Sequence, residues 1–136
     1  MALGEAVIRI VAIGVGCRAG VSGATIAALA RIALAEFGEP EGERLLFTLD
    51  AKAAESGIVE AAALLGAKAT PLPLAALQAE AGRVLTPSKA AEARFGAPNI
   101  AEAAALAGAG NGARLLGPRL AMDGATCAIA LSAECP

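Results

Sequence analysis

The sequence contains no histidine, no tryptophan and no tyrosine, and phenylalanine occurs only three times. Histidine is the commonest metal ligand and general base, so its absence removes the usual donor of a metal site and the usual proton acceptor in catalysis. The scarcity of aromatic rings argues against a stacking surface for nucleic acid. The 11 basic and 13 acidic residues give a net charge of −2 without a basic block, which also argues against nucleic acid. From these absences together we expect neither nucleic acid nor a metal ion as a partner.

Cysteine and long apolar runs are also scarce. The three cysteines, Cys17, Cys127 and Cys135, are odd in number and lack C-x-x-C spacing, which argues against a disulfide framework and against a zinc site. The apolar runs are far shorter than the about 20 residues of a membrane-spanning helix. The first residues lack the basic stretch of a signal peptide. We therefore expect a cytoplasmic protein that does not enter a membrane.

What the sequence has is small apolar residues in an alternating pattern of strands and helices. Its 136 residues are 57% hydrophobic and suffice for one domain over residues 1–136. Alternation of strand and helix predicts a three-layer α/β/α fold with a mostly parallel or mixed sheet of about five strands. We expect the last two strands to form an antiparallel edge of that sheet.

The boundaries of the expected elements follow from hydrophobic period and turn residues. We predict strands over residues 5–13, 44–49, 68–72, 113–116 and 126–131. We predict helices over residues 23–36, 74–81 and 100–107, a helix capped by Ser56 that ends at residue 65, and a short helix after residue 88 that ends near residue 95. Asn99 and Glu102 have the spacing of a capping box for the last helix. Met122-Asp123-Gly124 predicts a hairpin turn.

A glycine-rich segment between the first strand and the first helix is the clearest candidate binding site. Gly14, Gly16 and Gly20 enclose Cys17 and Arg18, and the helical pattern begins directly afterwards. Backbone N–H groups and the helix dipole attract an anion at such a helix start, and arginine adds a permanent cation. We therefore expect an anionic small molecule to bind at this helix start. A tight turn that needs glycine for its backbone alone is the alternative.

Two other interpretations of the same segment are weaker. The third glycine comes one residue too late for the G-x-G-x-x-G fingerprint, and residues 39–41, where its acidic residue is expected, form a Pro/Gly loop. The spacing thus disfavours a nucleotide cofactor, and we expect none. Cys17 at a helix start has the setting of a reactive thiol, but a small buried thiol beneath the turn fits better because no histidine is available to activate it.

The loop after the second strand is the second candidate. Asp50, Lys52, Glu55 and Gly57 lie there, and the carboxyl ends of parallel strands open on one crevice. We therefore expect Lys52 and Arg18 to face the same ligand. A solvated loop with an internal ion pair is the alternative.

Two further cations complete the set of candidates. Ser88 has the position of an N-cap, which places Lys89 in the first turn of a helix, where a cation opposes the helix dipole. A ligand would explain this placement, and so would a tolerant surface. Arg119 follows Gly117-Pro118 at the end of a strand.

Four segments in this order resemble one protein family. They are residues 14–20, 48–58, 87–89 and 96–106, and the resemblance that they carry covers nearly the whole chain. The chain resembles the family of CobE and the C-terminal domain of CbiG, which belongs to cobalamin (vitamin B12) biosynthesis. The resemblance implies a precorrin-type tetrapyrrole as the ligand and other enzymes of the pathway as partners.

The family resemblance also leaves the activity open between binding and catalysis. CbiG is associated with opening a lactone ring of a cobalt-precorrin, and we expect this chain to act without the other regions that accompany the domain in CbiG. We expect a carrier or accessory factor that binds the tetrapyrrole. A precorrin lactone hydrolase is the first alternative, with Asp50 or Glu55 as its base, and a nucleotide-binding oxidoreductase domain is the second.

Overall fold

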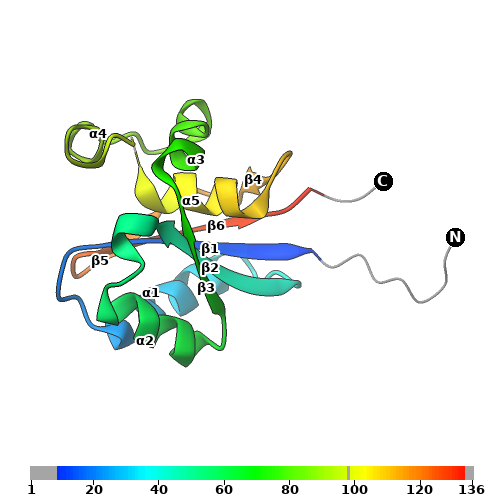
Figure 1. Cartoon of the computed structure of the whole chain (residues 1–136). Coiled ribbons are helices and arrows are strands. Elements are labelled where there is room, and N and C mark those ends of the chain that lie inside the picture. The colour runs from blue at the N-terminus through cyan, green and yellow to red at the C-terminus, as the bar shows by residue number, and fades with distance from the viewer. Residues whose placement is uncertain (1–8, 98, 134–136) are drawn as a thin grey trace, which may run out of the picture.

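The structure is a computed structural model that describes residues 9–97 and 99–133 (Figure 1). Helices lie on both sides of one central sheet. The elements along the chain are β1 (Ile10–Cys17), α1 (Gly23–Glu36), β2 (Glu43–Leu49), η1 (Asp50–Lys52), α2 (Ser56–Leu65), β3 (Lys68–Leu72), α3 (Leu74–Gln78), η2 (Ala81–Arg83), α4 (Lys89–Phe95), α5 (Ile100–Ala109), β4 (Arg114–Leu115), β5 (Leu120–Met122) and β6 (Ala125–Leu131).

The sheet is mixed, and its strand order is β3-β2-β1-β6-β4, with β5 paired to β6. β1 pairs in parallel with β2, and β2 with β3, whereas β6 runs antiparallel to β1. The predicted three-layer α/β fold is confirmed. The expected antiparallel edge is wrong in one respect, because β6 lies in the interior of the sheet. Six of its seven residues are buried, which is typical of a strand covered on both faces.

The first strand extends further along the chain than predicted. Residues 5–8 lie outside the described part of the chain, and β1 continues through Gly14 and Gly16 to Cys17. The two glycines therefore belong to the strand and not to the turn after it. The turn begins at Arg18, and Gly20 supplies its positive φ of 83°.

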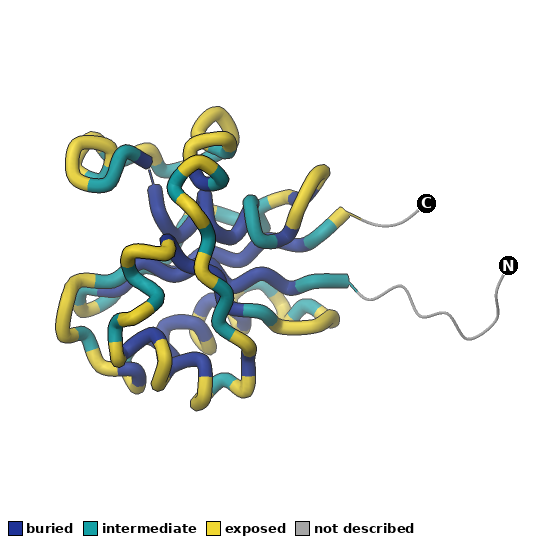
Figure 2. The backbone as a smooth tube through the Cα atoms, viewed as in Figure 1, coloured by how far each residue is buried: buried dark blue, intermediate teal, exposed yellow. Residues whose placement is uncertain are grey.

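Two apolar cores lie on the two faces of the sheet. Alternate residues of β1 point to opposite faces, so Val11, Ile13 and Val15 pack with α1 and α2, while Ala12 packs with α5. Burial is concentrated in β1, β2, β6, α1 and α5 (Figure 2). Seven of the ten residues of α5 are alanine or glycine. These small side chains let the helix approach the sheet closely.

Local signals predicted most of the helix ends. The side chains of Ser22, Ser88 and Asn99 cap α1, α4 and α5 by accepting a backbone N–H bond. The expected cap at Ser56 is wrong, since Glu55 occupies the cap position of α2 and makes no side-chain cap bond there.

The remaining differences concern the end of the chain. The hairpin turn is confirmed, with positive φ at both Asp123 and Gly124, but its first strand, β5, was not predicted. The capping box is only half formed: the Asn99 side chain accepts the Glu102 N–H at 3.0 Å, whereas the Glu102 carboxylate bonds elsewhere. No helix within the described residues is long and apolar enough to cross a membrane.

The buried thiol of Cys127 makes stability depend on alkaline pH. Burial raises its pKa from 9.0 to about 12. The unfolded thiol therefore ionises while the native thiol keeps its proton, so the free energy of unfolding has its full value below pH 9 and falls as the pH rises towards 12. We expect a loss of about 2 kcal/mol by about pH 10.5.

Urea unfolding followed by circular dichroism at a series of pH values measures this loss. The variant Cys127→Ala provides the comparison, because every other titrating group is the same in both proteins. Its stability profile should be flatter over this range by the stated amount. Parallel profiles for the two proteins would contradict the prediction.

Candidate functional site

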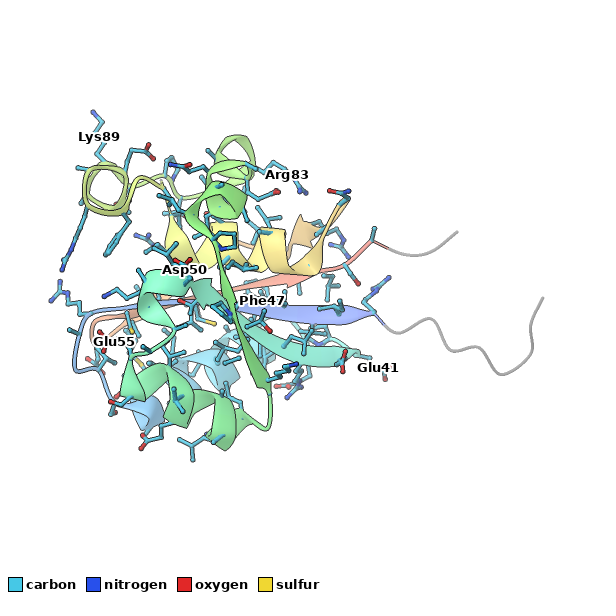
Figure 3. All side chains as sticks on the ribbon, in the orientation of Figure 1. Glu41, Phe47, Asp50, Glu55, Arg83 and Lys89 are labelled. Carbon is cyan, nitrogen blue, oxygen red and sulfur yellow. The ribbon has the colours of Figure 1, made fainter. Side chains whose placement is uncertain are left out.

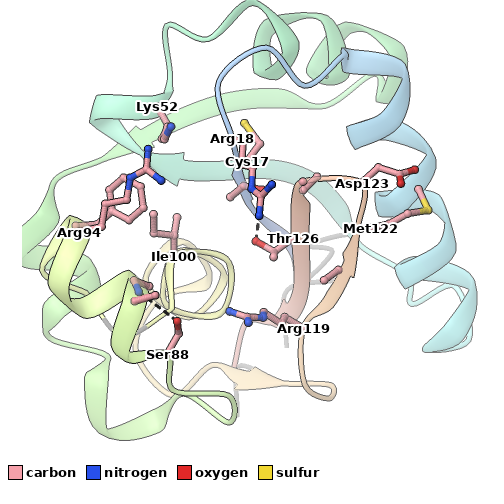
Figure 4. A pocket seen from close by; sticks show the side chains of 17 residues that line it. Cys17, Arg18, Lys52, Ser88, Arg94, Ile100, Arg119, Met122, Asp123 and Thr126 are labelled. Atoms are coloured by element: carbon pink, nitrogen blue, oxygen red, sulfur yellow. Dashed lines mark hydrogen bonds between the residues drawn. The ribbon is translucent and has the colours of Figure 1, made fainter.

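A cavity of about 490 Å³ lies at the carboxyl end of β1 (Figure 4). Its volume is in the range typical of small-molecule sites. Four parts of the chain form its wall: the end of β1, η1, α4 with the start of α5, and the segment from Arg119 to Thr126. The lining residues are Gly16, Cys17, Arg18, Lys52, Ser88, Ala90, Ala91, Arg94, Phe95, Ile100, Arg119, Ala121, Met122, Asp123, Gly124, Ala125 and Thr126.

The topology of the sheet explains why these parts meet. β1 and β2 are parallel, so Arg18 and Lys52 emerge at the same edge. β6 runs antiparallel to β1, which brings its first residue, Ala125, opposite Cys17 at that edge. The β5–β6 hairpin therefore continues the wall on the other side. Ligands of open α/β sheets bind at this end of the strands.

Four cations surround the cavity, namely Arg18, Lys52, Arg94 and Arg119 (Figure 4). Within residues 9–97 and 99–133, none of the four forms an ion pair with an acidic side chain within 4.0 Å. Asp123 is the single acidic residue among those that line the cavity. The lining thus carries a net positive charge that its own residues leave uncompensated.

Two of these cations share one aromatic ring. The Lys52 Nζ lies 5.5 Å from the centre of the Phe95 ring, and the Arg94 guanidinium carbon lies 5.3 Å from it. Both distances suit a cation–π interaction. Two like charges beside one ring repel each other, so an anion placed between them would be bound strongly.

The lining also has small and apolar residues beside the cations. Ile100 and Gly16 form part of it, and the Thr126 hydroxyl donates to the Gly16 carbonyl at 3.4 Å. A side chain on Gly16 would meet this hydroxyl and Ile100. Ile100 is the first residue of α5, so the positive end of that helix dipole also lies at the cavity.

Cys17 lies at the cavity with its thiol half-buried. Burial raises its pKa above 9.0; the nearby Lys52 lowers the pKa, and Glu55 raises it. The net effect is a thiol that stays protonated near neutral pH, whereas a nucleophilic cysteine needs a lowered pKa. The raised pKa does not favour a reactive thiol, but the expected burial beneath the turn is wrong, because Cys17 ends β1 and lines the cavity.

The cavity contains half of the residues predicted as binding residues. The structure brings together Gly16, Cys17, Arg18, Lys52, Ser88 and Arg119. They come from positions up to about a hundred residues apart in the sequence. The expectation that Arg18 and Lys52 face one space agrees with this placement.

The other predicted residues lie outside the cavity. Gly14 packs against α5, and Gly57 packs against the Val21 carbonyl. Gly20 is exposed in the turn. Asp50 is exposed and begins η1, while Glu55 is the cap residue of α2. Lys89 points away from the body of the protein (Figure 3).

The start of α1, where we expected an anion, also lies outside the residues that line the cavity. Gly23, the first residue of α1, is buried, and Glu60 of α2 packs directly against it. The Ser22 side chain already accepts the Thr25 N–H at 3.2 Å. A carboxylate thus lies beside this helix start, whereas four cations line the cavity at the end of β1, so the cavity is the stronger candidate site.

Arg94 and Phe95 are the most important residues that sequence reasoning missed. The helix at this place was predicted, and its 3.6-residue period contains the missing signal. Ala91, Arg94 and Phe95 are three and four residues apart and share a face, while Lys89 lies on another. Thr126 and the hairpin residues gave no such signal, because their place depends on the pairing of β6 with β1.

A metal ion has no evident ligand set in the described part of the chain. No group of three His, Cys, Asp or Glu side chains there has the geometry to hold one.

Comparison with known proteins shows that the sequence matches one protein family. The chain matches the family described as "Cobalamin synthesis G C-terminus" over residues 11–130. Protein CobE of Sinorhizobium sp is 39% identical over 119 residues, which are 87% of this chain and 77% of that protein.

Two solved structures show the same likeness. The crystal structure of a CobE, described as a protein from the cobalamin (vitamin B12) biosynthetic pathway, matches with a TM-score of 0.83 and 36% identity over 90% of each chain. The cobalamin biosynthesis protein chiG from Agrobacterium tumefaciens matches with a TM-score of 0.69 and 34% identity, over 91% of this chain and 99% of that one.

Proposed function

Since this chain belongs to the cobalamin synthesis G C-terminus family, we propose that its cavity binds a tetrapyrrole intermediate of cobalamin biosynthesis through the ligand's carboxylates. In this role the protein acts as a carrier or as an accessory factor for another enzyme of the pathway. One observation carries the proposal: four cations from four parts of the chain converge on one cavity without acidic partners.

The chemistry of such a ligand suits the lining. Precorrin-type intermediates are large rings whose edges bear acetate and propionate carboxylates. A charge-assisted hydrogen bond contributes about 1.5–3 kcal/mol. Two or three of these bonds, together with apolar contact at Ile100 and Phe95, are enough for micromolar affinity.

The arrangement of the cations suggests two points of attachment. Lys52 and Arg94 flank the Phe95 ring, so one ligand carboxylate placed between them would relieve their repulsion. Arg18 and Arg119 lie on other elements of the wall. Contacts on more than one edge of a ring favour a polycarboxylate over a ligand with a single charge.

An absorbance titration with two corrins tests the proposal. Cobyrinic acid carries carboxylate side chains, and cobinamide carries amides on a similar ring. We expect saturable micromolar binding of cobyrinic acid that weakens with salt, much weaker binding of cobinamide, and no binding of NADPH. Equal affinity for the two corrins, or no saturable binding of cobyrinic acid, would contradict the proposal.

Single replacements of the two predicted cations give a more specific test. Arg18→Ala and Lys52→Ala should each weaken cobyrinic acid binding by about 1–3 kcal/mol, because each removes a charged donor from the cavity. The melting temperature should change little, since Arg18 is exposed and Lys52 only partly covered. A double variant that binds as well as the parent would show that the two residues do not share a ligand.

A further inference from the structure

Glu102 is a fully buried acidic residue that does not line the cavity. Its Oε1 accepts the backbone N–H groups of Leu85 at 2.7 Å and Thr86 at 2.9 Å. Its Oε2 accepts the Thr86 hydroxyl and the Arg119 N–H, both at 2.8 Å. Each carboxylate oxygen thus has two donors. Burying a charge is costly, and these four bonds are what compensate the cost here.

The partners of Glu102 lead directly into the cavity wall. The Arg119 N–H belongs to a residue whose side chain lines the cavity, and Thr86 lies two residues before Ser88, the cap of α4. Glu102 itself is in the first turn of α5, close to Ile100. One carboxylate therefore connects three separate parts of the wall.

The connection matters most for α4, the helix that carries Arg94 and Phe95. None of its residues is buried, and it stands at the edge of the molecule (Figures 1 and 2). Apart from the partly buried Phe95 ring, which packs against the core, α4 is held in position by hydrogen bonds at its two ends. The first end is held by Glu102 and by the Asn99 amide, which donates to the Thr86 carbonyl at 2.8 Å. The second is held by Gln78, which donates to the Gly96 carbonyl at 3.0 Å.

We propose that Glu102 is the positioning residue of the cavity, which holds Arg119 and the α4 segment at the spacing that the ligand needs. The ligand contact rests on the proposed function. The anchoring of residues 85–97 and Arg119 does not, because it follows from the hydrogen bonds alone. In metal sites the loss of a partner that orients a ligand typically changes affinity by roughly 10–100-fold, and we expect an effect at the lower end of that range here.

A matched pair of threonine variants tests the proposal. Thr86→Val removes one hydroxyl bond to Glu102. Thr48→Val removes one hydroxyl bond, at 2.7 Å to the Val15 carbonyl, between two sheet residues that are not among those that line the cavity. Both changes keep the side-chain volume. We expect Thr86→Val to speed amide hydrogen exchange in residues 85–97 and to weaken cobyrinic acid binding, each about tenfold, and Thr48→Val to do neither.

A second variant separates positioning from general damage. Glu102→Gln replaces one oxygen by an NH₂ group that faces two donors, and it should loosen the same segment. If Glu102 acts through Arg119, the loss of affinity caused by Glu102→Gln should be smaller in an Arg119→Ala background. If the double variant lost affinity by the product of the two single losses, Glu102→Gln would act independently of Arg119, through an indirect effect on stability.

The hydrogen-exchange measurement and the binding measurement test two different claims. Unchanged exchange in residues 85–97 of both Thr86→Val and Glu102→Gln would overturn the positioning role, whatever the protein binds. Equal losses of affinity in Thr86→Val and Thr48→Val would overturn it as well. A parent protein that does not bind cobyrinic acid would overturn the proposed function, and the exchange measurement would still decide the role of Glu102.

Discussion

Replacing Gly14 by alanine is expected to destabilise the protein by about 3 kcal/mol or more, the upper part of the range for an overpacked core. A Cβ at this position would lie 2.6 Å from the Ala105 nitrogen and 2.9 Å from the Ala105 Cβ, and closer still to the Ala101 carbonyl oxygen. These atoms belong to the backbone and the shortest side chain of α5, so no side chain is able to move aside. The helix itself has to shift away from β1.

Urea unfolding followed by circular dichroism measures this effect, with Gly20→Ala as the control. Gly20 has a positive φ of 83°, but no atom lies within 4 Å of the position of its Cβ. Its replacement should cost only the strain of that backbone conformation, about 1 kcal/mol. Similar losses for both variants would show that close packing on α5 is not the reason for glycine at position 14.

The charge reversal Arg94→Glu is expected to weaken binding of cobyrinic acid by about two to three orders of magnitude. The change removes one donor and places a carboxylate beside the Phe95 ring, where Lys52 already lies. Lys52 would then pair with the introduced carboxylate instead of the ligand. Like charges in an interface cost several kcal/mol, in addition to the bond that is lost.

Lys89→Glu on the same helix is the matched control. It makes the same change in net charge, but Lys89 points into solvent and does not line the cavity (Figure 3). At about 0.15 M salt an exposed charge is screened over about 8 Å. The affinity of the Lys89→Glu variant for cobyrinic acid should therefore stay within roughly threefold of that of the parent. If the two reversals weakened binding equally, the general charge of the protein, and not the cavity, would govern the affinity.

α4 carries two of the residues that would contact the ligand, Arg94 and Phe95, yet it is held less firmly than the strands. The strands and α5 are held by buried apolar contacts, whereas α4 has no buried residue and is held by the partly buried Phe95 ring and by polar contacts at its two ends. Such segments open more easily than a core strand. A ligand that bridges Lys52 and Arg94 would add a third attachment, between α4 and η1.

The sequence by itself determined the elements of this fold and much of their character. Hydrophobic period and turn residues predicted the parallel strands, the helices, the caps at Ser22 and Ser88 and the hairpin turn, because these signals are local. The resemblance to the cobalamin biosynthesis family is confirmed over residues 11–130. Arg18, Lys52 and Arg119 were predicted as ligand contacts, and the structure places all three at one cavity.

Only the tertiary structure decided how those parts meet. Residues of β1 and β6 that pair with each other, such as Gly16 and Thr126, are more than a hundred residues apart, and no local pattern specifies their register. This pairing puts the hairpin at the cavity and leaves Gly14 facing α5. The rotation of α4 likewise turns Arg94 towards the cavity and Lys89 away from it, and the buried Glu102 bonds to segments on both sides of it in the chain. These choices depend on contacts between distant segments, which form only when the whole chain packs.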